Sequence, residues 1–404
     1  MKILIVNKFL YPRGGAETYI DRIGRALKSL GHSVQYFGMC DRRNTMGNEL
    51  GLETGAMDFH SRSLSRFTYP LRILYSTEAS RKLQKVAAAF EPDVIHLNNI
   101  NFQLTPSVIH RAAKMGIPMV QTVHDFQMIC PNHLMLEPRK KVLCDKCVEG
   151  SKWNCARNRC IHGSLAKSVL GSLEGELYRY LPEYDKISRF VCPSFFLEKQ
   201  LLRDPRYAGK TMVLHNFTLK GEEALELEKQ DYVLYFGRLA EEKGIHRLLE
   251  ACRRLPDIPF VAAGSGPLEG LFDDCPPNVR FVGFRTGQEL DRLISQARFS
   301  VYFPVWYENC PLSVLESLAL GTPVLANRIG GIEELVRDGE TGVLIDEFTP
   351  DHYAAQIDRL YRDKERLARL TKNCQRQEGI MTLEAYCEKL LQLYEAVCRK
   401  GKRQ

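Results

Sequence analysis

The sequence has few of the features that mark a membrane-spanning, disordered or fibrous chain. None of its apolar runs approaches the roughly 20 residues that a transmembrane helix needs. The opening stretch Met1–Asn7 is too short for a signal peptide and has no small-residue cleavage site. With 404 residues, 44% hydrophobic and 26% charged, and without a low-complexity tract, the composition is that of a globular protein of two or three domains. We therefore expect a first β-strand at Met1–Asn7 and a cytoplasmic protein.

Charge is distributed unevenly along the chain. The formal net charge is +7, but residues 1–215 hold 31 Lys and Arg against 19 Asp and Glu, so this half carries +12 and the remainder −5. The split predicts two units, the first of which meets an anionic membrane surface or a phosphate-bearing substrate. Nucleic acid is an alternative partner, although no nucleic-acid-binding module is recognisable. The basic residues crowd two stretches, Arg62, Arg66, Arg72, Arg81, Lys82 and Lys85, then Arg139, Lys140, Lys141, Lys146, Lys152, Arg157 and Arg159.

Short apolar runs alternate with helical patterns along the whole chain, which favours parallel sheets covered by helices. The predicted strands are Ile3–Asn7, Ser33–Phe37, Asp93–Leu97, Met119–Val123, Phe190–Pro193, Met212–His215, Tyr232–Phe236, Phe260–Ala263, Arg280–Val282, Ser300–Phe303, Pro323–Ala326 and Val343–Ile345. Thr18–Leu30 has apolar residues at helical spacing. Two doubly wound domains bind ligands at the carboxyl ends of their strands, so we expect the active site in a cleft between them.

Domain boundaries follow from the polar segment Lys220–Gln230, which we interpret as a linker. We expect an N-terminal domain at 1–218, a C-terminal domain at 219–380 and a terminal segment at 381–404. The helical pattern Leu383–Arg399 in that segment is expected to pack back on the N-terminal domain.

Two helix starts carry candidate anion-binding residues. Gly14 and Gly15 follow the first strand and open a helix, where exposed backbone N–H groups favour a phosphate or carboxylate. The alternative is an ordinary turn between strand and helix. In the second half, Gly237 ends a strand, and Arg238 and Lys243 flank the entrance to the helix Ile245–Cys252. Two cations at this spacing suit a diphosphate, whereas the alternative is a pair of solvated charges.

Two carboxylates lie close together in the segment 304–319. Glu308 follows the strand Ser300–Phe303, and Glu316 lies inside a helix that starts near Pro311. The pair is able to hold hydroxyl groups, the outer carboxylate those of a sugar and the inner one those of a ribose. A hydrolase with paired acid and base is the alternative. The backbone amides of Cys310, Leu312 and Ser313 are expected near the same helix N-terminus.

Five of the thirteen cysteines fall between residues 130 and 160. Cys144 and Cys147 have the spacing at which two thiolates share one zinc ion, and two later cysteines complete a tetrahedral set. The polar segment 130–162 has little core of its own, so a structural zinc is able to order it. Free thiols in a loop are the alternative.

Six motifs in this order resemble the family 4 retaining glycosyltransferases over nearly the whole chain. The matching segments are Gly14–Glu17, Thr122–Asp125, Gly237–Gly244, Ala263–Pro267, Val282–Phe284 and the pair Glu308 and Glu316. The resemblance implies an α/β fold of the GT-B type, in which two doubly wound Rossmann-like domains face each other across an inter-domain cleft. A His beside an Asp after a buried strand, as at His124 and Asp125, is by itself often a structural pair, and only the family order favours a functional one.

The resemblance also implies roles for individual residues. Arg238 and Lys243 bind the donor diphosphate, Glu308 holds hydroxyls of the donor sugar, Glu316 holds the ribose and His124 faces the sugar. Gly283, Phe284 and Arg285 line the nucleobase pocket, and Gly14, Gly15 and Glu17 form a loop for the donor phosphate or acceptor. The remaining donor-site candidates are Gly237, Gly264, Asn309, Cys310, Leu312 and Ser313. Cys310 departs from the small residue that many relatives carry. The zinc set that the resemblance favours is Cys130, Cys144, Cys147 and Cys160, with Cys155 or His162 as substitutes.

The leading functional hypothesis is a retaining hexosyltransferase that extends a cell-surface polysaccharide. It takes a nucleotide sugar, UDP-linked in preference to GDP-linked, and a glycan or polyprenyl-diphosphate-linked acceptor at the anionic inner membrane leaflet. The family needs no catalytic metal, and no Asp-x-Asp signature stands at the expected place. A nucleotide-sugar epimerase or sugar phosphorylase on the same frame is the second hypothesis. A zinc-stabilised nucleic-acid-binding protein is the third, but it leaves Arg238, Lys243 and the two glutamates unexplained.

Overall fold

The computed structural model describes residues 1–55, 69–219, 227–376 and 379–401. The chain forms two compact units, one made of Met1–Leu214 with the segment that begins at Leu383, the other of His215–Thr382. These limits lie within four residues of the expected ends at 218 and 380. Most of the expected linker, residues 220–226, and the basic residues Arg62 and Arg66 lie outside the described residues.

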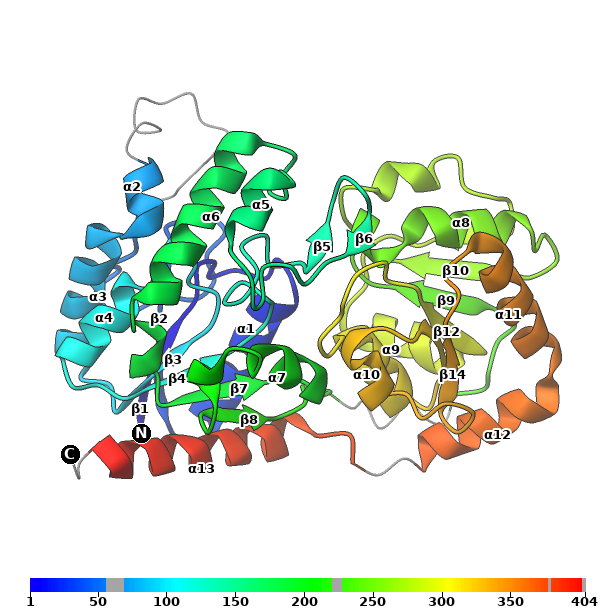
Figure 1. Ribbon diagram of the computed structural model, residues 1–404. Helices are drawn as coiled ribbons and strands as arrows, with labels where there is room; N and C mark the ends of the chain where they lie inside the picture. The colour runs from blue at the N-terminus through cyan, green and yellow to red at the C-terminus, as the bar shows by residue number, and fades with distance from the viewer. Residues whose placement is uncertain (56–68, 220–226, 377–378, 402–404) are drawn as a thin grey trace. The chain divides into compact units, whose positions relative to one another are not determined.

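The first unit is built on a parallel six-stranded sheet in the order β2-β1-β3-β4-β7-β8 (Figure 1). Its strands are rich in β-branched and aromatic residues and, apart from the half-buried β8, are largely buried, as expected for parallel strands covered on both faces. They are β1 Lys2–Val6, β2 Ser33–Phe37, β3 Val94–Leu97, β4 Met119–Thr122, β7 Arg189–Cys192 and β8 Thr211–Val213. A separate two-stranded antiparallel hairpin, β5 Leu136–Glu137 with β6 Val142–Leu143, lies in the cysteine-rich segment.

The helices of the first unit come from both of its segments, Met1–Leu214 and the segment that begins at Leu383. They are α1 Gly15–Ser29, α2 Tyr69–Leu74, α3 Thr77–Phe90, α4 Ser107–Lys114, α5 Trp153–Arg157, α6 Leu165–Tyr180, α7 Phe195–Leu201 and α13 Leu383–Gly401, with 3-10 turns at Tyr184–Lys186 and Pro205–Tyr207. Helix α13 packs against α1 and β4, although more than 250 residues separate it from these elements (Figure 1). The C-terminal helix therefore belongs to the first unit.

The second unit has a parallel sheet in the order β11-β10-β9-β12-β13-β14. Its strands are β9 Val233–Phe236, β10 Phe260–Ala263, β11 Val279–Phe281, β12 Phe299–Tyr302, β13 Val324–Asn327 and β14 Gly342–Ile345. Its helices are α8 Ile245–Arg253, α9 Gly287–Gln296, α10 Leu312–Ala319, α11 Pro350–Arg362 and α12 Lys364–Gln375, with 3-10 turns at Glu241–Lys243, Glu269–Phe272 and Gly330–Glu334. All twelve predicted strands are thus confirmed, with ends that differ by at most two residues.

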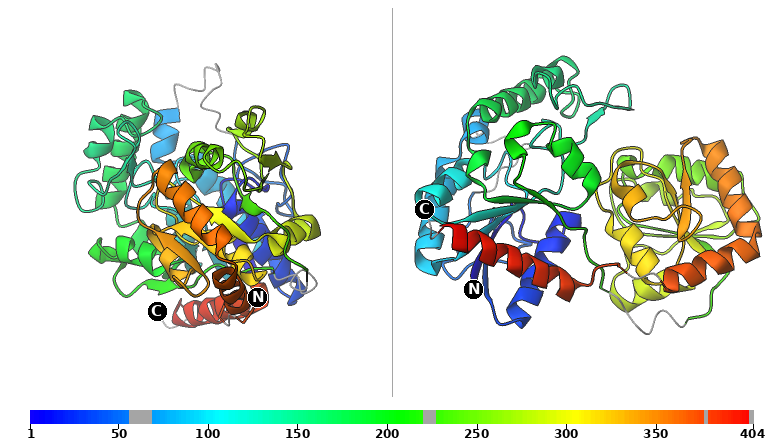
Figure 2. Two further views of the ribbon diagram at one scale, coloured as in Figure 1. Left: turned by 90° about the vertical axis from the view of Figure 1, so that its right-hand side faces the viewer. Right: turned by 60° about the horizontal axis from the view of Figure 1, so that its bottom comes forward.

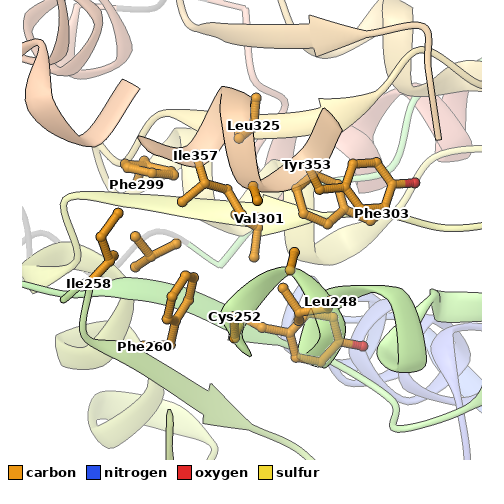
Figure 3. Close-up of a cluster of buried hydrophobic side chains, with 14 of the residues drawn as sticks. Leu248, Cys252, Ile258, Phe260, Phe299, Val301, Phe303, Leu325, Tyr353 and Ile357 are labelled. Carbon is orange, nitrogen blue, oxygen red and sulfur yellow. The ribbon is translucent and has the colours of Figure 1, made fainter. Parts of the chain in front are cut away.

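Helices flank the sheet of the second unit (Figure 2), and a core of buried side chains between them holds its strands in place (Figure 3). Phe299 and Val301 of β12 lie among side chains from β10, α8 and α11, and the rings of Phe303 and Tyr353 stack with centroids 4.1 Å apart. Side chains buried to this extent each contribute roughly 1.5–3 kcal/mol relative to exposed ones. The loops that follow β9 and β12 are therefore carried on a rigid frame.

Each sheet contains a point where the strand order reverses. In the second unit this point lies between β9 and β12, and in the first unit between β1 and β3. In open α/β sheets, ligands bind outside the carboxyl ends of the strands at such points. The candidate residues that follow β9, β12 and β1 stand at these positions. Among the described helices, none combines the length and the apolar composition needed to span a bilayer.

Candidate functional site

Backbone contacts fasten together the three loops that follow β9, β10 and β11. Gly237 N–H donates to Ala263 O at 3.0 Å, and Gly264 N–H donates to Gly283 O at 2.9 Å. Gly264 has φ +154, and a Cβ there would lie 1.9 Å from Gly237 O. Only glycine permits this approach. Three of the predicted donor-site glycines, Gly237, Gly264 and Gly283, thus form one rigid edge.

Lys243 and Glu308 meet at the point where the strand order reverses. Lys243 Nζ lies 2.5 Å from Glu308 Oε1, and both side chains are more than four-fifths buried. The same ammonium donates to the Tyr302 hydroxyl at 3.0 Å, and Trp306 Nε1–H donates to Glu308 Oε1 at 2.9 Å. Burial beside Glu308 raises the pKa of Tyr302 well above its ordinary value, so this hydroxyl stays protonated. Lysine, tyrosine and tryptophan therefore fix the carboxylate of Glu308.

Arg238, Phe284 and Arg285 are the more accessible candidates. The Arg238 side chain is 55% exposed, with a weak ion pair to Glu242 at 3.8 Å. Phe284 is 65% exposed, in the loop after β11, and Arg285 pairs with Glu289 at 3.5 Å. An exposed aromatic ring and a guanidinium group that are not locked in the core are available to stack on or contact a ligand.

Sequence reasoning missed the residue that positions the backbone of Glu308. Gly330 has φ +63, and a Cβ there would lie 2.2 Å from Glu308 O. The next residue, Gly331, donates its N–H to the same carbonyl at 2.7 Å. This glycine pair follows the strand β13, just as Gly14 and Gly15 follow β1, and that repeated pattern was the available signal.

Helix α10 begins at Leu312, one residue after Pro311, as predicted. Leu312, Ser313 and Glu316 are partly exposed on its first turns, and Asn309 precedes it. Cys310 is buried, and burial raises the pKa of its thiol to about 12. Asn216 donates its side-chain amide to Cys310 O at 2.9 Å and its backbone N–H to Cys310 Sγ at 3.3 Å. The thiol and the carbonyl of Cys310 are thus used within the protein.

In the first unit, Asn7 links the loop that follows β1 to the loop that follows β3 and to the first turn of α1. Its Oδ1 accepts from Asn99 N–H at 3.0 Å, and its Nδ2 donates to Glu17 Oε1 at 3.3 Å. Gly14 caps helix α1, and Glu17 is buried in the first turn of that helix. A Cβ on Gly15 would meet no atom within 4 Å, so packing does not explain the absence of a side chain there. The negative charge of Glu17 already compensates the positive end of α1.

His124 lies just beyond the end of β4. Its Nε2 is 2.9 Å from Asn98 Oδ1, and its ring packs edge-on against Tyr19 with centroids 5.0 Å apart. Burial lowers the pKa of His124 to about 4, although the carboxylate of Asp125 acts in the opposite direction. The imidazole is therefore neutral at physiological pH. Asp125 accepts a hydrogen bond from Gln127 N–H at 2.9 Å.

The five cysteines of the insert surround one small cavity of about 10 Å³. Its lining residues are Cys130, Cys144, Cys147, Cys155 and Cys160, with Asn132, Leu136, Asn154 and Asn158. Burial raises the pKa of the Cys130 thiol to about 11 and that of Cys147 to about 12. His162 is not part of the lining. Within the described ranges, no three Cys, His, Asp or Glu side chains stand in a geometry ready to hold a metal ion.

Comparison with known families matches two models to consecutive parts of the chain. The model described as Glycosyltransferase Family 4 covers residues 13–218, and the model described as Glycosyl transferases group 1 covers residues 218–377. Among curated proteins, a 42.6 kDa protein in the cps region of Klebsiella pneumoniae is 26% identical, over 83% of this chain and 88% of its own length. The α-D-kanosaminyltransferase of Streptomyces kanamyceticus is 32% identical, over 36% of this chain and 40% of its own.

Two solved structures share the fold at low sequence identity. Sucrose-phosphate synthase from Thermosynechococcus elongatus has a TM-score of 0.71 at 19% identity, over 98% of both chains. Anabaena HepE in complex with UDP-glucose has a TM-score of 0.67 at 17% identity, over 98% of this chain and 100% of that one. Both sheets and the family matches agree with the GT-B architecture. The chain therefore belongs to glycosyltransferase family 4 and is a retaining, nucleotide-sugar-dependent glycosyltransferase.

Proposed function

We propose that the second unit binds the donor nucleotide sugar at the residues around Lys243 and Glu308. The observation that carries this assignment is the buried pair of Lys243 Nζ and Glu308 Oε1 at the reversal of strand order. In the absence of ligand the two charges neutralise each other, which keeps both side chains in place. A diphosphate then competes for Lys243, and sugar hydroxyls compete for Glu308.

The other donor-site residues act around this pair. Arg238 adds a second positive charge to the diphosphate, and its exposure leaves it able to close over the ligand. Phe284 and Arg285, with the backbone of Gly283, contact the nucleobase, while Glu316 accepts from the ribose hydroxyls. We assign contacts with the sugar or the phosphates to the backbone N–H groups of Cys310, Leu312 and Ser313, near the N-terminus of α10.

Charge stabilisation at the leaving group is the main catalytic contribution of this unit. As the bond between the anomeric carbon and the diphosphate oxygen breaks, negative charge grows on the nucleoside diphosphate, and Arg238 and Lys243 stabilise it. The acceptor hydroxyl attacks from the same face, and its proton passes to the departing phosphate oxygen. We assign the role of orienting the reacting sugar to His124, whose imidazole is neutral at physiological pH. Once both cationic groups, those of Arg238 and Lys243, contact the bound diphosphate, they are in place before the charge develops.

The donor assignment is testable by calorimetry with UDP, GDP and a panel of their sugar conjugates. We expect binding of UDP-sugars, loss of binding in Lys243→Ala and retained binding in Arg254→Ala, whose ion pairs with Glu250 and Asp351 lie on the surface of the same unit. Nucleotide release with and without glycan acceptors then separates transfer from the epimerase and phosphorylase hypotheses. An absence of heat with every nucleotide and nucleotide sugar would contradict the proposal.

For the acceptor we propose a glycan on a lipid carrier, at an anionic membrane surface. The first unit carries most of the excess positive charge, and helix α6 exposes Leu165, Leu173 and Tyr180, which is 80% exposed. These three positions fall on one side of the helix and present an exposed apolar strip in the more basic half of the chain. The pathway that fits this acceptor is cell-surface polysaccharide synthesis, which the cps-region relative also suggests.

Vesicle flotation tests the membrane contact. The protein is expected to float with vesicles that contain phosphatidylglycerol and not with pure phosphatidylcholine. The double variant Leu165→Glu, Tyr180→Glu should lose this binding, whereas Leu50→Glu, at an exposed leucine of the same unit, should keep it. Equal flotation of both variants would contradict the assignment to α6.

For the cysteine-rich insert we propose a structural zinc ion held by Cys130, Cys144, Cys147 and Cys160. Its support is that these four cysteines line one small cavity. The four thiols would hold the ion as thiolates, and the ion would supply a cross-link that orders the insert. Elemental analysis of chelator-free protein should give about one zinc per chain, lost in Cys144→Ser and kept in Cys275→Ser, a cysteine of similar burial elsewhere. Zinc-free protein with a native melting temperature would overturn it.

A further inference from the structure

A chain of buried polar groups connects the C-terminal helix α13 with strands β3 and β4. Tyr394 OH lies 2.6 Å from His96 Nδ1, and His96 Nε2 lies 2.8 Å from Thr122 Oγ1. Thr122 Oγ1 is 3.1 Å from Tyr19 OH, which in turn is 2.8 Å from Tyr386 OH. These five side chains are at most 3% exposed. The two tyrosines of α13 thus hold both ends of one hydrogen-bond network.

The protonation states in this network are well defined. Burial lowers the pKa of His96 to about 3, so its imidazole is neutral and has one N–H donor and one acceptor nitrogen. Burial also raises the pKa values of Tyr19, Tyr386 and Tyr394, so their hydroxyls stay protonated. Each hydroxyl is able to donate and accept once, and the chain of bonds runs without a break in either direction.

The network ends against His124. The Tyr19 ring, held by Thr122 and Tyr386, packs edge-on against the His124 imidazole. On the other side, Asn98 Oδ1 accepts from His124 Nε2. Asn98 Nδ2 donates to the His96 carbonyl at 3.3 Å, which fixes the orientation of the amide. The bond to Asn98 Oδ1 assigns the hydrogen of His124 to Nε2, and the contact with Tyr19 sets the plane of the ring.

We propose that Tyr386 and Tyr394 of α13 are positioning residues for His124, acting through Tyr19 and through His96 and Thr122. This inference rests on the proposed role of His124 in the transfer reaction. Its consequence is that α13, which packs on α1 and β4, influences the rate of the reaction through this network.

If the network served only to attach α13 to the first unit, the tyrosine variants would give a different experimental result. Loss of a tyrosine hydroxyl would then lower the melting temperature and leave turnover at lower temperature unchanged. A positioning role lowers kcat in protein that is fully folded, because a small displacement of a group that orients the reacting centre has a large effect on rate. Substitution by phenylalanine keeps the ring and its packing, so it separates the two roles.

The experiment uses the full chain with Tyr386→Phe, Tyr394→Phe and His124→Ala. Tyr178→Phe is the control, since Tyr178 is equally buried in the same unit and bonds the backbone carbonyl of Leu74. Nucleotide release from the best donor is measured well below each melting temperature. We expect kcat to fall about 10- to 100-fold in Tyr386→Phe, less in Tyr394→Phe, and KM for the donor to stay within about twofold. The control should keep the wild-type kcat.

The outcomes separate this inference from the function on which it rests. Wild-type kcat in both α13 variants, with His124→Ala inactive, overturns positioning and leaves the proposed function standing. Wild-type kcat in His124→Ala overturns both roles. If the wild type turns over no donor, the tautomer of His124 is measured instead, from the ¹⁵N NMR signals of its ring nitrogens. A single Nε2–H tautomer that becomes mixed in Tyr386→Phe supports the inference, and an unchanged ring overturns it.

Discussion

Lys243 Nζ and Glu308 Oε1 lie 2.5 Å apart, although 65 residues separate them in the sequence. While no ligand is bound, each side chain neutralises the charge of the other. The ion pair keeps both charges oriented and partly shielded from water. On binding, we expect Lys243 to exchange Glu308 for the diphosphate, and Glu308 to exchange Lys243 for sugar hydroxyls. The energetic effect of removing either residue is therefore expected to appear in catalysis more than in folding.

Replacing Lys243 by alanine is expected to lower kcat/KM by about 10²–10³, which is the range found when one preorganised charge-stabilising donor is lost. Glu308 keeps the Trp306 indole as a donor, so the fold should remain intact. Steady-state kinetics and a melting curve check both statements. A variant with normal kcat/KM would show that Lys243 does not contact the leaving group.

Gly330→Ala is expected to impair activity and stability together. The added Cβ would lie 2.2 Å from Glu308 O, at a residue with φ +63, so the loop that carries Glu308 must shift. Gly339→Ala is the matched control, because Gly339 has φ +75 and open space around its Cβ. Both variants bear the same backbone strain of about 1–2 kcal/mol, and only the first should lose donor turnover. Equal turnover in the two variants would contradict this role of Gly330.

The first unit is expected to lose stability in mild acid. His96 has a pKa of about 3 in the folded protein, against an ordinary value of 6.5, so the unfolded chain binds the proton more tightly. Its contribution to stability is complete above pH 6.5 and is lost as the pH falls toward 3, by about 1.4 kcal/mol per pH unit. Melting curves of the wild type and of His96→Asn between pH 7.5 and 5 test this. The variant should be less stable at pH 7.5 but should have a flatter pH dependence.

Ionisation of Glu174 is expected to lower the stability of the first unit as the pH rises, which is the opposite of the effect of His96. Burial raises the pKa of this carboxyl from 4.5 to about 8, and its Oε1 has no hydrogen-bond partner among the described residues. The folded state therefore holds a proton that the unfolded chain releases, and stability is complete below pH 4.5 and falls as the pH rises toward 8. Glu174→Gln, which cannot ionise, should raise the melting temperature more at pH 8 than at pH 5. A larger gain at pH 5 would refute the assignment.

The sequence predicted the strands well because buried parallel strands are short, continuous apolar runs, and such runs are local features. It also predicted that Lys243 and Glu308 follow strands β9 and β12. The pairing of these two residues could not be predicted, since it depends on β9 and β12 being neighbours in the sheet. The contact of Gly330 with Glu308 and the bond between Tyr19 and Tyr386 join segments whose spacing carries no pattern. Both contacts depend on strand order and helix packing, which arise only in the folded chain.

The position of α13 has a consequence for biosynthesis. Ribosomes produce the chain from its N-terminus, so Tyr19, His96 and Thr122 emerge long before Tyr386 and Tyr394 can reach them. At about 5–20 residues per second, the interval between residues 214 and 394 is roughly 10–40 s. Throughout that time, the surface of the first unit that α13 later covers stays exposed. The Tyr19 hydroxyl and the His96 imidazole then lack their partners on α13. The unit whose synthesis begins first is thus completed last, because α13 is part of it.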